Sequence, residues 1–509
     1  MSEQIASSFA LVLTIIYQQI TDFLCQITAF LVILLLVFFN VLMKKNYLHH
    51  VLWLVLIILI ALLAAYWLPG IDIAGVEMRR VDMLSEITGV DNGDNEADSV
   101  NLMLSDSIIE AHKPEFVDSC RSGMTCIEDY SDDKRGMSPF YEALRSSKSR
   151  PVRIAVLGDS YIEGDIFTAD LRNMLQDTYG GCGVGFVPMS SETSGFRRSV
   201  IHKFGGWKEF SAVANHKRYD HNISIISGRY FYPDSSAWMQ LSGQKTYCTH
   251  LNECEQSSIF LLSNGSNTIT ASINGGADSR TFNVDASNDI QSLTVYGNIH
   301  RVRWTSSRMG GDYVFYGASM DCLNGIILDN FSLRGCRGSN LAYLHDDMII
   351  KFHRVRPYDL VILMYGLNVA SSHGKDYGKY KQSMENAINK MKANMPGAGF
   401  LVISVGDREE RVDGKFRTMR GVKNLIRYQQ AIAADCGIAF WNLYEAMGGE
   451  GSIVKMVNSK PSEANLDYTH INFRGGRHLA KIFFETLQYG KDCYDRRCEY
   501  EGRKEGLRK

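Results

Sequence analysis

A serine follows directly after a short apolar segment of the chain. Residues Ile154–Leu157 are apolar and partly β-branched, as in a buried strand, and Gly158, Asp159 and Ser160 come next. One interpretation is a polar turn that caps a helix beginning near Phe167. The other is that the turn presents the Ser160 hydroxyl as a nucleophile, and the rest of the sequence must decide between them.

A histidine and a carboxylate near the C-terminus could activate this serine. A serine hydroxyl needs a base to take its proton, and the base is usually a histidine oriented by a carboxylate. Asp467 and His470 are three residues apart, so one turn could set the carboxylate against one imidazole nitrogen and leave the other facing Ser160. Such spacing is common by chance, and the alternative is a surface turn before a helix.

An acyl-transfer site also needs hydrogen-bond donors for the oxyanion of its tetrahedral intermediate. Asn368 comes soon after the apolar segment 359–364, so its side-chain amide is a candidate donor. The backbone N–H of Gly335 is unhindered, and the N–H of Ser160 itself is the third candidate. Gly338 fits the same local sequence as Gly335, so the choice between the two glycines stays open.

The elements that must position these residues alternate between strands and helices. Alternation of this kind favours a doubly wound parallel sheet, in which sites lie at the carboxyl ends of strands. Ser160 and Asn368 both follow such ends. The apolar segments are 154–157, 359–364, 400–405 and 438–441, and helical character covers 167–179, 377–394, 423–436 and 477–487.

A different pattern interrupts the α/β pattern. Between about residues 198 and 320, short strand-like segments alternate with turn segments such as SNGSN and NGGADS. Regular turns between short strands predict a β-sandwich. The simplest architecture is an α/β domain, 151–197 and 321–490, that an all-β domain interrupts.

Together, the motifs resemble the SGNH (GDSL-type) hydrolases. The chain contains GDSY, then a glycine, then GLN after an apolar strand, then DxxH before a final helix, although Val369 stands where many members have aspartate. The resemblance implies a flavodoxin-like three-layer fold. It also implies Ser160 as nucleophile, Asp467 and His470 as the rest of a triad, and an oxyanion hole formed by Ser160, Gly335 and Asn368.

The inserted β domain narrows the resemblance to peptidoglycan O-acetylesterases, which carry a carbohydrate-binding type of sandwich at this place. The implied activity is removal of O-acetyl or other small acyl groups from a cell-wall or surface glycan through an acyl-enzyme. An O-acetyltransferase that uses the same triad is one alternative. A glycan-binding membrane protein without activity is another.

The N-terminus differs from the rest of the chain. Segments 23–43 and 51–69 contain no charged residue, and each approaches the roughly 20 residues that cross a bilayer as a helix. They predict a membrane anchor over 1–70 that contacts lipid, followed by a linker over 71–150. Lys44 and Lys45 favour an extracytoplasmic location for the domains, whereas Arg79 and Arg80 argue the opposite way.

Composition limits the other possibilities. The chain has 509 residues, 45% hydrophobic and 22% charged, with a net charge of −2 that gives no reason to expect nucleic-acid binding. Ten of its 11 cysteines lie beyond the first apolar segment, and the close pairs 120/126, 248/254 and 493/498 suit disulfides in an oxidising compartment. No closely spaced cysteine motif predicts zinc, so we expect neither a metal nor a cofactor. Residues 491–509 form a charged tail.

Overall fold

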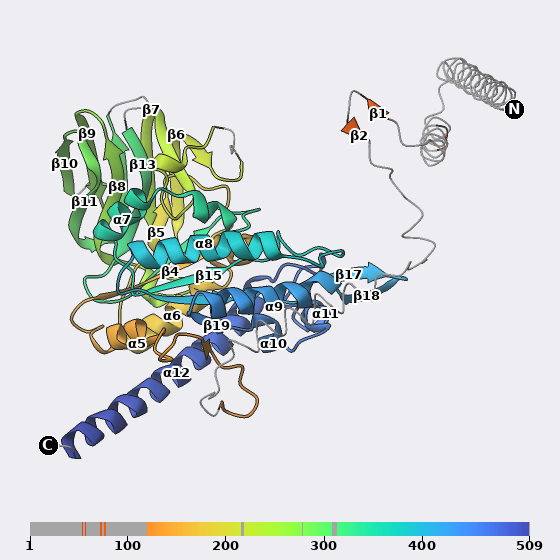
Figure 1. Ribbon diagram of the computed structural model, residues 1–509. Helices are drawn as coiled ribbons and strands as arrows, with labels where there is room; N and C mark the ends of the chain where they lie inside the picture. The colour runs from red at the N-terminus through yellow and green to blue at the C-terminus, as the bar shows by residue number, and fades with distance from the viewer. Residues whose placement is uncertain are drawn as a thin grey trace, which may run out of the picture. The chain divides into compact units, whose positions relative to one another are not determined.

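The computed structural model describes residues 120–214, 218–276, 278–307 and 313–507, together with residues 53, 56, 72, 73, 76 and 77 (Figure 1). The chain divides into two compact units, Met1–Asp94 and Asn95–Lys509. In the first unit, β1 (Asp72–Ile73) pairs antiparallel with β2 (Val76–Glu77). All the residues for which the sequence predicts chemistry lie in the second unit.

A six-stranded sheet forms the centre of the α/β part. Five strands are parallel, and β3 is antiparallel to β19 at one edge. In chain order, β4 is the first of the five parallel strands, followed by β14 and then β15. In the sheet, β4 lies between β14 and β15, which creates a topological switch point at its carboxyl end. The order is β14 (Gly325–Ser332), β4 (Pro151–Gly158), β15 (Leu360–Met364), β16 (Gly399–Ile403), β19 (Ala439–Trp441) and β3 (Glu128–Asp129).

Two layers of helices cover this sheet. Parallel strands are joined by right-handed crossovers, so the helix leading from β4 to β14 lies on the opposite face from those leading to β15, β16 and β19. The first layer contains α5 (Ser138–Arg145), α6 (Thr168–Tyr179) and α12 (Phe473–Leu507), and the second contains α7 (Asp346–Val355), α8 (Gly378–Asn394) and α9 (Arg420–Asp435). Two short helices, α10 (Leu443–Ala446) and α11 (Ser452–Asn458), precede α12.

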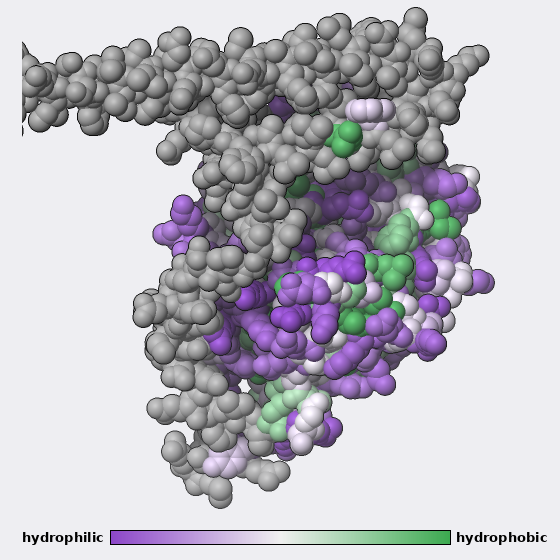
Figure 2. All heavy atoms as spheres, turned by 90° about the vertical axis from the view of Figure 1, so that its right-hand side faces the viewer, coloured by the Kyte–Doolittle hydropathy of each residue, from purple (hydrophilic) through white to green (hydrophobic). Residues whose placement is uncertain are grey.

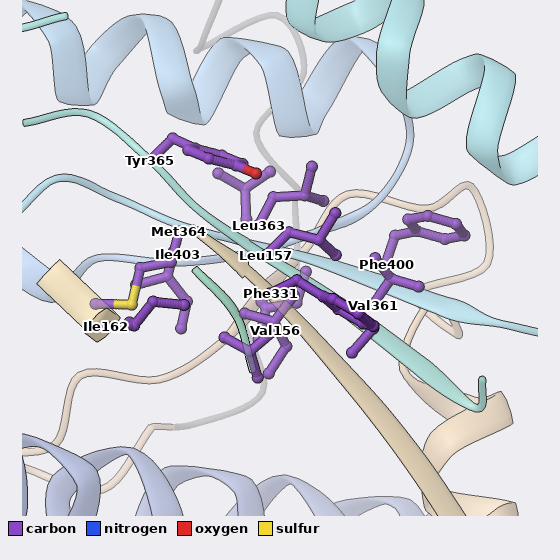
Figure 3. Close-up of a cluster of buried hydrophobic side chains, with 14 of the residues drawn as sticks. Val156, Leu157, Ile162, Phe331, Val361, Leu363, Met364, Tyr365, Phe400 and Ile403 are labelled. Atoms are coloured by element: carbon purple, nitrogen blue, oxygen red, sulfur yellow. The ribbon is translucent and has the colours of Figure 1, made fainter. Parts of the chain in front are cut away.

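The central strands are apolar because helices bury both of their faces. Every residue of β15 and β16 is buried. Val156 and Leu157 of β4 pack beside Val361 and Leu363 of β15 (Figure 3). Since each fully buried side chain of this kind contributes about 1.5–3 kcal/mol, this core holds the carboxyl ends of β4 and β15 in fixed positions.

The second large element is a nine-stranded antiparallel sheet. Its main path runs β10 (Asp278–Val284), β9 (Asn267–Ile273), β12 (Arg301–Ser306), β7 (Arg229–Ser242), β13 (Tyr313–Asp321), β8 (Cys254–Ser263) and β11 (Ser287–Ile299). In addition, β5 (Gly185–Pro188) pairs with β13, and β6 (Ile201–Ser211) pairs with β7.

The predicted fold class is wrong in its description of this insert as a sandwich of two sheets. The 14-residue strand β7 pairs with β6 along one edge, and its other edge pairs with β12 and, at Phe231, with β13. The single strand β7 is therefore hydrogen-bonded to strands that would belong to two different sheets in a sandwich. Regular turns indicate many short strands, but they do not indicate whether hydrogen bonds connect those strands into one sheet or two.

The predicted transmembrane helices find no support among the residues that the structure describes. Within the described part of the chain, no helix has both the length and the apolar character needed to cross a membrane. The longest, α12, has 35 residues, and charged residues occur along it. Apart from residues 53 and 56, the segments 23–43 and 51–69 lie outside the described residues.

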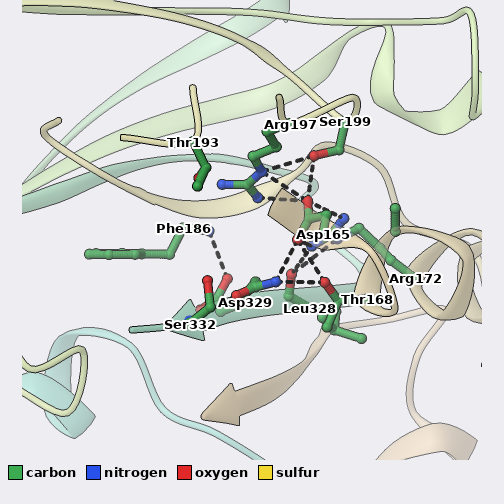
Figure 4. A network of polar contacts seen from close by, with 12 residues as sticks. Asp165, Thr168, Arg172, Phe186, Thr193, Arg197, Ser199, Leu328, Asp329 and Ser332 are labelled. Carbon is green, nitrogen blue, oxygen red and sulfur yellow. Dashed lines mark hydrogen bonds and ion pairs between the residues drawn. The ribbon is translucent and has the colours of Figure 1, made fainter. Parts of the chain in front are cut away.

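A buried ion-pair network joins the α/β part to the start of the insert (Figure 4). The carboxylate of Asp165 accepts hydrogen bonds from Arg172 at 3.2 Å, from Arg197 at 2.9 Å and from Ser199. Burial raises the pKa of Asp165, but the positive charges of Arg172 and Arg197 hold it well below its usual range. Because a buried charge without its partner is strongly destabilising, this network fixes the segment that precedes β6.

The end of the insert is fastened in a similar way. The buried guanidinium of Arg356 donates to Asp321, at the end of β13, and to Asp329 in β14, each at 2.8 Å. A disulfide joins Cys182, just before β5, to Cys322, just after β13. The chain passes between the two sheets before β5 and after β13. Buried ion pairs hold both of these connections, and the disulfide joins one to the other.

The predicted disulfides are confirmed for one of the three neighbouring pairs, Cys120–Cys126. The Cys182–Cys322 bond joins residues 140 positions apart, and sequence spacing did not reveal it. The other cysteines in the described part are free thiols, namely Cys248, Cys254, Cys336, Cys436, Cys493 and Cys498.

Candidate active site

The turn after β4 begins with a glycine because the chain passes close to the neighbouring strand. A Cβ on Gly158 would lie 2.7 Å from the carbonyl oxygen of Met364, so a larger residue would push β4 and β15 apart. Asp159 then caps the short helix η1 (Ser160–Asp165) through a hydrogen bond from the Tyr161 N–H. Ser160 is the first residue of η1, at the carboxyl end of β4.

Ser160, His470 and Asp467 form one hydrogen-bonded chain. The Oγ of Ser160 lies 2.9 Å from Nε2 of His470, and Nδ1 of His470 lies 2.8 Å from Oδ2 of Asp467. A carboxylate can only accept, so the Nδ1 of His470 carries the proton and Nε2 is free to accept the hydroxyl proton. The structure thus brings together three side chains that the sequence places up to 310 residues apart.

The three-residue spacing lets one carboxylate hold both the ring and the backbone of the histidine. Oδ1 of Asp467 accepts from the backbone N–H groups of Thr469 and His470, each at 3.0 Å, while Oδ2 accepts from the ring. Burial raises the pKa of Asp467, but these hydrogen bonds lower it overall. Asp467 therefore stays ionised, and the exposure of 49% of its side chain to water also favours the charged form.

Two of the predicted oxyanion donors, Gly335 and Asn368, lie in the loops that follow the two strands flanking β4. Gly335 follows the end of β14 and Asn368 follows β15, and the Asn368 amide donates to the carbonyl oxygen of Cys336 at 3.1 Å. The Gly338 N–H is turned toward the Cys336 sulfur, and Gly338 is buried. By contrast, Gly335 is exposed, and its N–H has no acceptor within the described part of the chain. This difference favours Gly335 as the donor.

From the sequence, Asp159 was expected only to form part of a capping turn, but it also orders the loop that carries Asn368. Its buried carboxylate accepts from the backbone N–H groups of Gly366 and Leu367, both at 3.2 Å. Burial raises the pKa of Asp159 to about 6, against the opposing effect of these hydrogen bonds. Asp159 is thus a positioning residue that links the turn carrying Ser160 to the turn carrying Asn368.

A β-hairpin that the sequence analysis missed supports the histidine loop. It consists of β17 (Glu409–Val412) and β18 (Lys415–Thr418), and its Asp-Gly turn is a strong hairpin signal. The Phe416 ring stacks on Tyr468, with ring centroids 3.8 Å apart, and the Glu409 N–H donates to the Tyr468 carbonyl oxygen at 3.1 Å. Figure 2 shows the side of the molecule on which this hairpin lies in Figure 1, where hydrophobic residues form small patches among hydrophilic ones.

The described residues include one group with metal-type ligand atoms close together, formed by Cys182, Glu255 and Cys322. The two sulfurs are already bonded to each other, so neither is the thiolate that a metal would need. The arrangement around Ser160 instead has the parts needed for acyl transfer, namely a nucleophile, a base and an oriented carboxylate.

Comparison with solved structures reveals a similar fold. A structure of a peptidoglycan O-acetylesterase matches with a TM-score of 0.59 at 20% identity, over 72% of this chain and 99% of that one. A family two carbohydrate esterase from Clostridium thermocellum (11% identity, 50% and 93% covered) and an acetyl xylan esterase (17%, 32% and 81%) each match with a TM-score of 0.25.

No protein-family model matches the chain, and the search of curated proteins finds no match. The likeness to the peptidoglycan O-acetylesterase covers nearly all of that protein. At the level of the fold, the predicted resemblance to peptidoglycan O-acetylesterases is confirmed.

Proposed function

We propose that this protein is a serine ester hydrolase that removes O-acetyl or other small acyl groups from a cell-wall or surface glycan. The observation that carries the proposal is the hydrogen-bonded chain Ser160–His470–Asp467 at the carboxyl end of β4. That position is the switch point of the parallel sheet, where ligands bind in this class of fold.

In the first half of the reaction, the Oγ of Ser160 attacks the carbonyl carbon of the ester as Nε2 of His470 takes its proton. The resulting oxyanion accepts hydrogen bonds from the N–H groups of Ser160 and Gly335 and from the Asn368 amide. The bond to the sugar oxygen then breaks, and His470 returns the proton to that oxygen. The products of this half are a free sugar hydroxyl and an acyl-enzyme.

In the second half, water replaces the sugar. His470 takes a proton from the water as the water oxygen attacks the acyl carbon. It then gives this proton to the Oγ of Ser160 as the bond from Oγ to the acyl carbon breaks and the carboxylic acid leaves. Asp467 stabilises the imidazolium that forms in both halves and keeps the proton on Nδ1. A sugar hydroxyl in place of water would give acyl transfer instead.

The glycan part of the proposal draws support from the peptidoglycan O-acetylesterase whose fold this chain resembles. We also propose an extracytoplasmic location. Two disulfides support it, because such bonds persist in oxidising compartments and are rare in the cytosol.

The test compares the wild-type protein with the variants Ser160→Ala and Ser383→Ala, the second being a partly exposed serine on α8. We expect the first variant to lose hydrolysis of a chromogenic acetyl ester and labelling by a fluorophosphonate probe, and the second to keep both. Full activity in Ser160→Ala would refute the assignment. Mass spectrometry of wall glycan after treatment should reveal lost acetyl groups, whereas acetyl groups gained by an oligosaccharide acceptor would identify a transferase.

A further inference from the structure

The loop between β5 and β6 contacts both segments that carry the reacting groups. The ring of Phe196 lies so close to Gly164 that a Cβ on that glycine would be 2.5 Å from it. The same ring packs against Phe473, with centroids 4.9 Å apart. Gly164 is four residues after Ser160, and Phe473 is three residues after His470, so this loop forms part of the rim of the candidate active site.

Arg197, the residue that follows Phe196, holds the loop in this position. The side chain of Arg197 is 9% exposed and forms an ion pair with the fully buried carboxylate of Asp165 at 2.8 Å. Figure 4 shows Arg197 beside Asp165. Asp165 directly follows Gly164, so the ion pair and the Phe196 contact act on the same turn. A buried arginine cannot leave its partner without a large penalty, and the residues on either side of Arg197 are therefore held in place before any substrate binds.

Those two flanking residues are exposed. Phe196 is 50% exposed. The Arg198 guanidinium lies 3.8 Å from the ring centroid of Phe473 and 5.2 Å from that of Tyr247. Contacts with ring faces leave the in-plane N–H donors of an arginine free to bind a carboxylate in a bidentate way.

The charge of Arg198 is not neutralised by its neighbours. Within the described part of the chain it forms no ion pair, including with Glu192 of the same loop. The other nearby acids have their own partners, since Glu163 pairs with Arg334 and Asp170 pairs with Arg477. Arg198 is therefore an exposed cation without an ion-pair partner in the described part of the chain, and it lies over the ring of Phe473, three residues after His470.

We propose that Phe196 and Arg198 form a substrate subsite that binds an acidic sugar next to the acylated one. In this Phe196–Arg198 subsite, the aromatic ring covers the apolar face of the sugar, and the guanidinium pairs with its carboxylate. The proposal rests on the proposed function and narrows it, because the preferred substrate becomes an acylated acidic glycan rather than a neutral one.

The test measures selectivity, defined as the ratio of kcat/KM for acetylated polygalacturonate to that for acetylated xylan. The variants are Arg198→Ala, Arg198→Lys and Arg198→Glu. The matched control is Arg280→Ala, since Arg280 also lies over a phenylalanine ring, 5.0 Å from the Phe282 centroid, on the insert surface.

We expect Arg198→Ala to lower this ratio about fivefold, as for the loss of one well-oriented ion pair. Arg198→Glu should lower it further, Arg198→Lys should keep part of it, and Arg280→Ala should keep all of it. Because partly exposed charges are screened by salt, the wild-type ratio should also fall as ionic strength rises. An unchanged ratio in Arg198→Ala, or an equal loss on both polymers, would overturn the subsite.

A binding experiment separates failure of the subsite from failure of the proposed function. Calorimetric titration of the Ser160→Ala protein with trigalacturonate and with xylotriose needs no catalysis. Tighter binding of the acidic sugar, lost when Arg198→Ala is added, supports the subsite even if the wild type hydrolyses no ester. Equal binding of both sugars contradicts it even if the wild type is an active esterase.

Discussion

The side-chain amide of Asn368 donates a hydrogen bond of 3.1 Å to the carbonyl oxygen of Cys336, and so joins the loop after β15 to the loop after β14. Gly335 directly precedes Cys336, so the two donors proposed to flank the oxyanion are held as one unit. The amide has two hydrogens, and the Cys336 carbonyl uses one of them. The second is available to an oxyanion at Ser160.

We therefore expect Asn368→Ala to lower kcat for acetyl ester hydrolysis about 10²–10³-fold with little change in KM, because the lost donor acts mainly on the transition state. Initial rates over a range of substrate concentrations measure both constants. Asn394→Ala, at the partly exposed last residue of α8, is the control and should behave like the wild type. A rise in KM with an unchanged kcat would show that Asn368 binds substrate instead.

The second prediction concerns Asp467, which holds His470 by both its ring and its backbone. In Asp467→Asn an amide can donate to Nδ1, which favours the tautomer with its proton on Nε2, where Ser160 needs an acceptor. We expect kcat to fall about 10²–10⁴-fold. The control is Asp413→Asn in the hairpin turn, and activity within twofold of the wild type in Asp467→Asn would contradict the role.

The residues of this site could be found from sequence because strand ends are easy to locate. A buried parallel strand is an uninterrupted apolar run, so Ile154–Leu157 and 359–364 marked β4 and β15. Parallel strands bring their carboxyl ends to one edge of the sheet, so Ser160 and Asn368 had to lie near each other. The DxxH spacing then supplied His470.

Long-range pairings could not be found in the same way. Cysteine spacing favoured neighbours, but Cys182 and Cys322 meet because β5 and β13 pair within the insert. The extent of that antiparallel sheet depends on which strands share the edges of β7, and turn signals do not specify this. The second role of Asp159, which is to order the Asn368 loop, could not be predicted. A carboxylate that follows a strand has the same sequence pattern whether it caps one turn or orders two.

The third prediction concerns Phe416, whose ring stacks on the ring of Tyr468. In the sequence, Tyr468 lies between Asp467 and His470. Tyr468 has a φ of 52°, a backbone conformation that a tyrosine rarely adopts without support. Phe416→Ala removes that support, so we expect a lower kcat with a smaller effect on KM, and Phe416→Tyr should restore it. Equal activity in all three proteins would mean that the hairpin does not position the histidine.

The fourth prediction concerns the Cys182–Cys322 disulfide, which closes a loop of 140 residues. By restricting the unfolded chain, a bond across so long a loop contributes about 2–5 kcal/mol to stability. Cys182→Ser with Cys322→Ser should therefore unfold at a lower denaturant concentration than the wild type. The Cys120–Cys126 bond spans six residues, so its removal should have the smaller effect, and the reverse order would contradict this account.

The last prediction concerns Glu409, a buried carboxyl in the first strand of the hairpin. Burial, and then the negative charge of Asp407, raise its pKa to about 7, well above the ordinary value of a glutamate. One of its oxygens has no hydrogen-bond partner, whereas Asp407 accepts from the Thr418 hydroxyl at 2.8 Å and from the Ile453 N–H at 3.0 Å. The neutral form of Glu409 thus suits the folded state better than the charged form.

The direction of the pH effect follows from this shift. When the pKa of a carboxyl is higher in the folded protein than in the unfolded chain, folding is favoured while the group is protonated and loses that advantage as pH rises through the folded value. Glu409→Gln stays neutral at every pH. The melting temperature of the variant relative to the wild type should therefore increase between about pH 5 and pH 8. Thermal unfolding at four pH values measures it, and a difference that does not change with pH would show that Glu409 is already ionised in the folded protein at pH 5.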